Sequence, residues 1–181
     1  MESLRGQLLV ASPALLDPNF ERTVVLIAEH DDSGAMGIVL NREAELSVAD
    51  ATDALEPLVE PGAMVHSGGP VQPTAVVIVA EFEDPQHAGV QIFGDVGFVA
   101  GDADFDLLAP SLKRARVFAG LAGWAPGQLE AELEREDWIV EPALVDDVFA
   151  DEPDSLWSAV LERKGGSFAL LARMPPDPSL N

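Results

Sequence analysis

The sequence predicts an α+β domain whose sheet is mixed and mainly antiparallel. Apolar, β-branched runs follow one another in hairpin-like pairs, and helical segments are interspersed without a regular strand–helix alternation. The chain has 181 residues, which suits one domain large enough to bury a core. Hydrophobic residues make up 48% of the chain, so its composition is not that of a disordered protein despite its charge.

The first third of the chain predicts three strands, which cover residues 8–12, 23–28 and 36–40. Thr23–Ala28 is a continuous β-branched run, which indicates a central strand buried on both faces. The cluster Asp31–Ala35 predicts the turn of a hairpin, in which Gly34 can adopt a positive φ. Pro13 and Pro18 make the segment between the first two strands a loop.

The middle of the chain predicts further strands and two short helices. Apolar residues near helical spacing predict a helix over residues 46–55, which Pro57 ends. A glycine turn follows over residues 66–71, and a short helix over 104–108 stops before Pro110. The predicted strands of this part cover residues 75–80, 89–93, 96–99 and 115–120.

The clearest helix covers residues 126–136. Pro126 stands near its start, where a missing N–H has no energetic consequence, and Leu129 and Leu133 give one apolar line. Residues 138–140 form a strand-like exit. The carboxylates of this helix are most simply a solvated face: Glu130, Glu132, Glu134 and Glu136. All three tryptophans are predicted to pack in the core: Trp124, Trp138 and Trp157.

A last helix is predicted over residues 156–163. Asp151 or Asp154 can cap its start, and Gly165-Gly166 closes its end. A final strand is predicted over residues 168–172. No repeat or long linker divides the chain, so we expect a single domain over residues 1–173 and a disordered tail over 174–181.

Charge and composition exclude several classes of function. Ten Lys and Arg residues stand against 32 Asp and Glu residues, and the net charge is −22. Such a surface repels phosphate backbones and anionic lipids, which argues against direct nucleic-acid binding and against a membrane partner. The acidity also fits a solubility trait of the host proteome. The absence of cysteine excludes disulfides, thiolate metal sites and Cys nucleophiles.

The sequence indicates a cytoplasmic protein. No apolar run approaches the roughly 18 residues of a transmembrane helix. The N-terminal segment has one Arg offset by one Glu, and Pro13 interrupts its apolar stretch, so it does not match a secretory signal.

The densest polar cluster is Glu29-His30-Asp31-Asp32. A histidine among carboxylates can bind a divalent cation. Neighbours in a strand point to opposite faces, however, so Glu29 and His30 cannot share one metal, and the register of an EF-hand is missing. We therefore interpret the cluster as a solvated turn with a hydrogen-bonded histidine.

The end of the predicted hairpin collects a second polar group. Asn41-Arg42 follow one of its strands, while Asp17, Asn19 and Arg22 precede the other. Antiparallel pairing brings the two sets together, where an ion pair of Asp17 with Arg22 or Arg42 would hold the loop. A structural lock is favoured, and a binding cleft is the alternative.

Two further motifs have weaker functional interpretations. Ser67-Gly68-Gly69-Pro70 can offer backbone N–H groups to an anion, but it lacks the Lys and the helix of a phosphate loop. A tight turn where two backbones approach is the favoured interpretation. Lys113-Arg114-Ala115-Arg116 is a small anion patch or a favourable charge after a helix end.

The order of these motifs resembles the YqgE/AlgH family over about residues 6–172. The residues that carry the resemblance are Ala11-Ser12-Pro13, Leu15, Asp17-Pro18-Asn19-Phe20, Arg22-Thr23-Val24-Val25, Glu29-His30-Asp31, Gly34-Ala35-Met36-Gly37-Ile38-Val39-Leu40-Asn41-Arg42, Gly68-Gly69-Pro70-Val71, Gly120, Gly123-Trp124, Gly127-Gln128-Leu129-Glu130 and Trp138. One departure is Glu43, where the family commonly has Pro.

The resemblance implies a bacterial cytoplasmic protein with a bent, partly barrel-like sheet flanked by helices. Some members carry the label of transcriptional regulator, but the resemblance implies no catalytic or binding residue. We therefore expect a non-catalytic regulatory or interaction protein with an unknown protein or small-molecule partner and no cofactor. The sequence leaves open whether the protein is an enzyme.

The alternative is a small-molecule-binding or enzymatic domain with a cleft near Asn19, His30, Asn41 and Gly68-Gly69. The candidate ligand-binding residues are Asn19, Arg22, His30, Asn41, Arg42, Gly68 and Gly69, with no catalytic or metal-binding residue assigned. Direct DNA binding is the least favoured hypothesis, because the sequence shows no basic helix-turn-helix and its negative net charge opposes binding to DNA.

Overall fold

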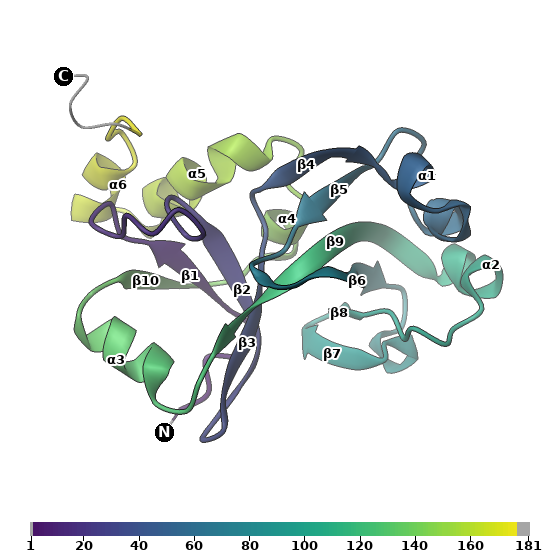
Figure 1. Ribbon diagram of the computed structural model, residues 1–181, viewed down its shortest axis with the longest axis horizontal. Coiled ribbons are helices and arrows are strands. Elements are labelled where there is room, and N and C mark those ends of the chain that lie inside the picture. The colour runs from purple at the N-terminus through teal and green to yellow at the C-terminus, as the bar shows by residue number, and fades with distance from the viewer. Residues whose placement is uncertain (1, 177–181) are drawn as a thin grey trace.

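In the computed structural model, which describes residues 2–176, ten strands form one bent sheet (Figure 1). Its main path runs β10-β1-β2-β3-β9-β6-β8-β7, with β5 paired to β9 and β4 to β5. The strands are β1 (Gln7–Ala11), β2 (Val24–Asp31), β3 (Gly34–Val39), β4 (Glu43–Ser47), β5 (Met64–Ser67), β6 (Val71–Phe82), β7 (Val90–Phe93), β8 (Val96–Phe98), β9 (Leu112–Trp124) and β10 (Trp138–Pro142).

The α+β prediction is confirmed. Every strand pair is antiparallel except β5 with β9, so the sheet is mixed and mainly antiparallel. The sheet bends without closing into a barrel, since β10 and β7 end its path unpaired with each other. The predicted hairpin is β2–β3, and Gly34 has a φ of 128°.

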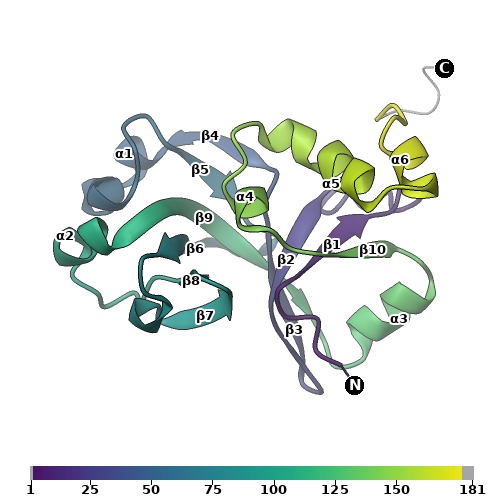
Figure 2. The same cartoon turned by 180° about the vertical axis from the view of Figure 1, so that it is seen from behind.

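Strand β9 joins the two halves of the sheet (Figure 2). Its first part pairs with β6 on one side and touches β5 at two positions on the other, whereas its end pairs with β3. The change of partners falls at Gly120, whose φ is 83°. A left-handed residue breaks the regular extension of a strand, and glycine adopts that conformation without steric cost. Gly120 therefore marks the point where the sheet bends.

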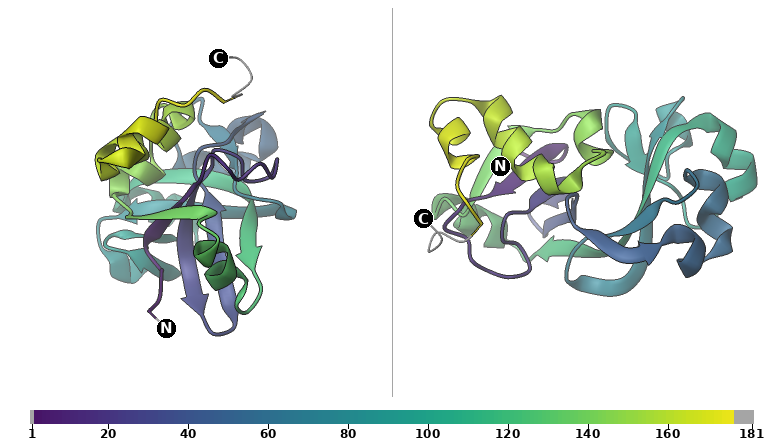
Figure 3. Two further views of the ribbon diagram at one scale, coloured as in Figure 1. Left: turned by 90° about the vertical axis from the view of Figure 1, so that its left-hand side faces the viewer. Right: turned by 90° about the horizontal axis from the view of Figure 1, so that it is seen from above.

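Short helices cover both faces and one end of the sheet. The helices are α1 (Val48–Ala51), α2 (Phe105–Leu108), α3 (Gln128–Glu134), α4 (Val145–Val148), α5 (Leu156–Lys164) and α6 (Ser167–Leu171), with 3-10 turns at Asp53–Leu58, Pro85–His87, Ala109–Ser111 and Pro153–Ser155. Figure 3 shows α5 and α6 over the β1–β2 region, far from α1 and α2 at the opposite end. Among residues 2–176, no helix has the length and apolarity needed to cross a lipid bilayer.

The core has three parts, and β2 contributes to two of them. Val24, Leu26 and Ala28 pack with the C-terminal helices, while Val25 and Ile27 pack with α3 and two tryptophans on the other face. This alternation confirms that β2 is buried on both faces. A third cluster lies at the far end of the sheet, under α1, α2 and the first 3-10 turn.

Two element predictions are wrong. The helix expected over residues 46–55 begins as β4, because the chain first pairs with the unpredicted strand β5, and the helix then ends at Thr52, which is extended. The strand expected over residues 168–172 is α6. Phe168, Leu171 and Ala172 have the i, i+3, i+4 spacing of a helix face, and they pack on the first core cluster.

The last long helix is confirmed, but its predicted cap is not. Residue Ser155 occupies the N-cap of α5 without a side-chain hydrogen bond, and Asp154 lies in the preceding 3-10 turn. Gly165 ends α5 as expected, with a φ of 80°. Residues 177–181 of the predicted tail lie outside the described residues, while Met174 accepts a hydrogen bond from Arg22.

Candidate functional site

Four of the seven sequence-predicted site residues meet at the end of the β2–β3 hairpin. We call Asn19, Arg22, Asn41 and Arg42 the hairpin-end network. Asn41 Oδ1 accepts from Val24 N–H at 2.9 Å, and Asn41 Nδ2 donates to Arg22 O at 2.9 Å. Arg42 donates to Asn19 O at 2.7 Å and to the carbonyl of the residue before Arg22 at 3.0 Å. The network thus ties the entry of β2 to the exit of β3.

The predicted ion pair of Asp17 is not what holds this loop. Asp17 Oδ1 accepts from Asn19 N–H at 2.8 Å, which closes a local turn. Both arginines instead donate to backbone carbonyls, and the Arg22 guanidinium lies 4.0 Å above the ring of Trp157. The hairpin-end network therefore has a structural role in every contact described.

Gly68 and Gly69 lie beside this network, in a turn that touches β9. Gly68 N–H donates to Ala119 O at 2.7 Å, and Gly68 O accepts from Val39 N–H at 2.8 Å. A Cβ atom on Gly68 would lie 2.3 Å from Gly120 O, so two backbones approach here more closely than any side chain permits. The N–H of Gly68 is therefore engaged by the carbonyl of Ala119 and does not face an anion.

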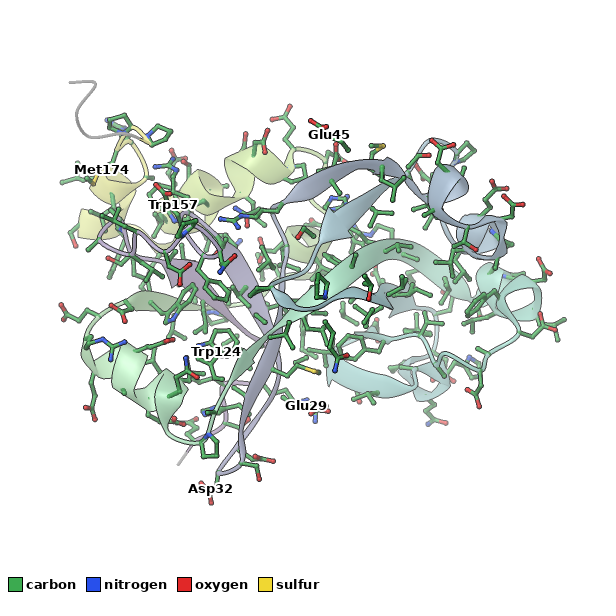
Figure 4. All side chains as sticks on the ribbon, viewed as in Figure 1. Glu29, Asp32, Glu45, Trp124, Trp157 and Met174 are labelled. Atoms are coloured by element: carbon green, nitrogen blue, oxygen red, sulfur yellow. The ribbon has the colours of Figure 1, made fainter. Side chains whose placement is uncertain are left out.

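His30 lies apart from the other six predicted residues. It is the second-to-last residue of β2, and the six residue steps from Val24 to His30 span about 20 Å of extended strand. His30 Nδ1 accepts from Leu4 N–H at 3.0 Å, so its proton is on Nε2, which lies 2.7 Å from Glu130 Oε1. The hydrogen bond from His30 lowers the pKa of Glu130. Glu29, the neighbour of His30, is exposed and points away from the sheet (Figure 4).

Two carboxylates of α3 are structural rather than solvated, which corrects the prediction of a wet helix face. Besides Glu130, Glu132 Oε2 accepts from Trp124 Nε1 at 2.7 Å and from Trp138 Nε1 at 2.9 Å. The two indole rings meet edge to face with centroids 6.1 Å apart, and Figure 4 shows Trp124 between β9 and α3. Glu134 and Glu136 are exposed as expected.

A cleft of about 520 Å³ opens where β5 and β9 diverge. The two parallel strands pair only at His66 with Phe118 and at Ser67 with Ala119. Before these positions, the cleft is lined by residues 57–64, by Ala109 and by residues 112–117. Glu43 of β4 and Phe149 and Asp151, which follow α4, complete the lining. None of the seven predicted residues lines this cleft.

His66 is the most unusual residue of the cleft. Its side chain is 3% exposed, and Nε2 has no hydrogen-bond partner within the described residues. Nδ1 lies 3.3 Å from Met64 O, which can only accept, so the proton is on Nδ1 and Nε2 presents a lone pair. Glu43 Oε2 lies 4.0 Å from His66 Nε2. Burial, and next the charge of Arg116, lower the pKa of His66 to about 4.

Arg116 forms the adjacent wall of the cleft. Its Nη1 donates to Val148 O at 3.2 Å and to Ala150 O at 3.0 Å, which holds the end of α4 against β9. Burial lowers the pKa of Arg116, and the nearby carboxylates of Asp151 and Glu43 oppose that shift. The guanidinium therefore stays charged within the cleft.

The stability of the fold is expected to fall between pH 6.5 and pH 4 because of His66. Its folded pKa of about 4 lies below the unfolded value of 6.5, so the unfolded chain binds the extra proton in that window. The stability that the fold gains from holding His66 neutral is complete above pH 6.5, and it is lost as the pH falls towards 4. We expect wild type to lose about 2 kcal/mol more than His66→Phe between pH 7 and pH 4.5 in urea unfolding, which allows for solvent screening in an open cleft. Parallel pH curves for the two proteins would contradict the assignment.

The sequence contained signals for part of this cleft. The run Lys113-Arg114-Ala115-Arg116 was a candidate anion patch, and its cations do line the cleft. His66 stood in a predicted glycine turn, and nothing in its sequence neighbourhood marked it, because its partner in β9 is Phe118, 52 residues later in the chain. Within residues 2–176, no group of three or more His, Asp or Glu side chains is placed to hold a metal ion.

These features define an α+β protein with an open, bent sheet and a small polar cleft beside a parallel strand pair. The family model described as AlgH-like matches residues 8–169. The chain is 44% identical to a UPF0301 protein of Streptomyces coelicolor, covering 100% of this chain and 97% of that protein. It is 42% identical to a UPF0301 protein of Thermobifida fusca, covering 99% and 96%. The chain belongs to the AlgH-like family, and the predicted family resemblance is confirmed.

Two solved structures have the same fold. The crystal structure of protein DIP2367 from Corynebacterium diphtheriae has a TM-score of 0.88 and 31% identity, covering 95% of this chain and 93% of that one. The solution structure of the AlgH protein from Pseudomonas aeruginosa has a TM-score of 0.70 and 31% identity, covering 96% and 95%. Both similarities extend over nearly the whole chain, so these two proteins share its overall fold.

Proposed function

We propose that this protein acts in the cytoplasm by binding, as a non-catalytic regulatory or interaction protein, and that it receives its ligand in the His66 cleft. The observation that carries the proposal is that Nε2 of the buried His66 has no hydrogen-bond partner in the described part of the chain, residues 2–176. A buried polar atom without a partner costs about 1–3 kcal/mol, and such atoms are rare in folded proteins. A ligand that donates a hydrogen bond to Nε2 would recover this energy.

The polar residues outside the cleft support ligand binding in the cleft rather than a catalytic site elsewhere in the protein. His30 and Glu130 are paired with each other, and Asn41 and Arg42 are committed to backbone groups. A catalytic acid or base has to reach a substrate, and these groups are fixed by intramolecular hydrogen bonds instead. The cleft has a volume within the roughly 300–1,000 Å³ of small-molecule sites.

A thermal-shift panel tests the proposal. It includes divalent metals, nucleotides, flavins, nicotinamides, amino acids and short duplex DNA. A ligand at about 100 times its dissociation constant adds about 2.7 kcal/mol, which corresponds to about 5–10 °C in a domain of this size. We expect a small molecule to raise the melting temperature of wild type and to have little effect on His66→Phe or Arg116→Gln.

The matched control is Arg135→Gln, which removes a cation that is paired with Asp137 and lies outside the cleft. It should respond to the ligand as wild type does. A compound that stabilises all four proteins equally binds elsewhere and would contradict the cleft. Conversion of the bound compound, followed by NMR over hours, would contradict the non-catalytic part.

Duplex DNA is expected to leave the melting temperature unchanged, even at low salt. The net charge of −22 opposes binding to phosphate backbones. Most arginines already have acidic or carbonyl partners, as in the pairs of Arg114 with Glu81 and Arg163 with Asp147. Salt-dependent stabilisation by DNA would favour a direct transcriptional role instead.

A further inference from the structure

The His66 end of the cleft presents two hydrogen-bond acceptors close together. Nε2 of His66 presents a lone pair, and Glu43 Oε2 stands 4.0 Å from it with its side chain half exposed. Both atoms can only accept hydrogen bonds. An ammonium group has three donors and no acceptor, so one ammonium can serve both atoms at once. A purely anionic ligand would be repelled by Glu43.

The Arg116 wall requires an acceptor. Only Nη1 of Arg116 is engaged by carbonyls among the described contacts, so further guanidinium N–H groups are available to the cleft. A guanidinium matches the geometry of a carboxylate, to which it can donate two parallel hydrogen bonds. Arg116 lowers the affinity of His66 for protons, which places its positive charge close to the histidine ring. Donor and acceptor requirements therefore lie side by side.

The charges of the cleft indicate a ligand without net charge. Its ionised lining residues are Glu43, Glu60, Asp151, Lys113, Arg114 and Arg116. They comprise three negative and three positive groups, and the positive Arg114 is already paired with Glu81 and Asp146 outside the lining, so the lining has no excess of positive charge. A ligand that carries one charge of each sign fits such a lining better than an anion or a cation. The remaining lining includes apolar side chains such as Leu58, Met64 and Phe149.

We infer that the His66 cleft binds a free α-amino acid with an uncharged, apolar side chain, an inference that rests on the proposed binding function. The α-ammonium lies between His66 Nε2 and Glu43, the α-carboxylate is held by Arg116, and the side chain packs on the apolar lining. A peptide N-terminus has the ammonium without the adjacent carboxylate and does not satisfy both walls.

Isothermal titration with the single amino acids L-leucine, L-methionine, L-valine and L-phenylalanine tests this inference. We expect at least one to bind wild type. The N-acetyl derivative of that amino acid lacks the ammonium and its carboxamide lacks the carboxylate, and each should bind at least about tenfold more weakly. The same loss is expected for the parent amino acid with His66→Phe and with Arg116→Gln. Arg135→Gln should bind within about twofold of wild type.

The analogue series uses wild-type protein alone, so it stays decisive if either cleft variant folds poorly. Analogues that bind as tightly as the parent amino acid would overturn the zwitterion inference. So would the absence of binding by all four amino acids at millimolar concentration. If another compound class then stabilises wild type through His66, the proposed function stands and only this inference fails. If no compound depends on His66, both fail.

Discussion

Replacing Gly120 by alanine is expected to reduce the free energy of unfolding by at least about 4 kcal/mol, a loss seen only for severe steric or packing faults. A Cβ at this position would lie 2.3 Å from Gly69 O and 3.3 Å from the Cα of Pro73. Real Cβ atoms do not approach a carbonyl oxygen so closely, so the turn at Gly68-Gly69 must separate from β9. Both the bend of the sheet and the β5–β9 pair depend on that contact.

Gly62→Ala is the matched control for this experiment. Gly62 has a φ of 82°, against 83° for Gly120, but no atom would lie within 4 Å of its new Cβ. It therefore isolates the backbone strain of a left-handed alanine, which we expect to cost about 1 kcal/mol. Urea unfolding measures both variants through their midpoints and slopes. Equal losses in the two variants would mean that the approach of the two backbones contributes nothing beyond φ strain.

Trp157→Ala is the second substitution with a large expected effect. Trp157 is 1% exposed, its Nε1 donates to Ala11 O at 2.8 Å, and Arg22 lies over its ring at 4.0 Å. Removing a buried tryptophan leaves a cavity and typically costs about 3–5 kcal/mol. Here the change also leaves the buried carbonyl of Ala11 without its partner and releases α5 from β1. We expect a melting temperature roughly 8–15 °C lower.

Trp157→Phe separates the cavity from the hydrogen bond. It keeps an aromatic ring under Arg22 but removes the donor to Ala11 O. We expect it to lose about 1–3 kcal/mol, less than the alanine variant. If Trp157→Ala costs under about 2 kcal/mol, then α5 does not depend on this residue for its position. Equal losses for the two variants would instead assign the whole effect to the hydrogen bond.

Much of the sheet was predictable from local patterns. The run Thr23–Ala28 is apolar at every position but the first, and β2 indeed packs on both faces. The polar set of Asn19, Arg22, Asn41 and Arg42 came together because antiparallel pairing in a hairpin is a local event. The interpretation of that set as a structural lock agrees with its contacts, and its binding role stays a prediction.

The candidate site was less predictable. β5 is four residues long, and its last two residues lie in a segment that the sequence predicts to be a turn. It pairs in parallel with β9, a strand far along the chain. Periodicity cannot detect a strand of four residues, because the apolar–polar alternation repeats only twice in it. The same limit applies to Glu132, which reads as one more exposed carboxylate until both indole N–H groups are found to converge on it.

The sequence by itself determined the α+β class, the β2–β3 hairpin, the family and the acidic surface that disfavours phosphate backbones. These follow from local periodicity, turn residues and a sum of charges, none of which depends on distant contacts. Only the tertiary structure decided which polar side chains form intramolecular hydrogen bonds and which do not. His30 and Glu130 meet across 100 residues, and His66, whose Nε2 has no hydrogen-bond partner among residues 2–176, packs against Phe118 of β9, because burial and hydrogen bonding are set by segments far apart in the chain.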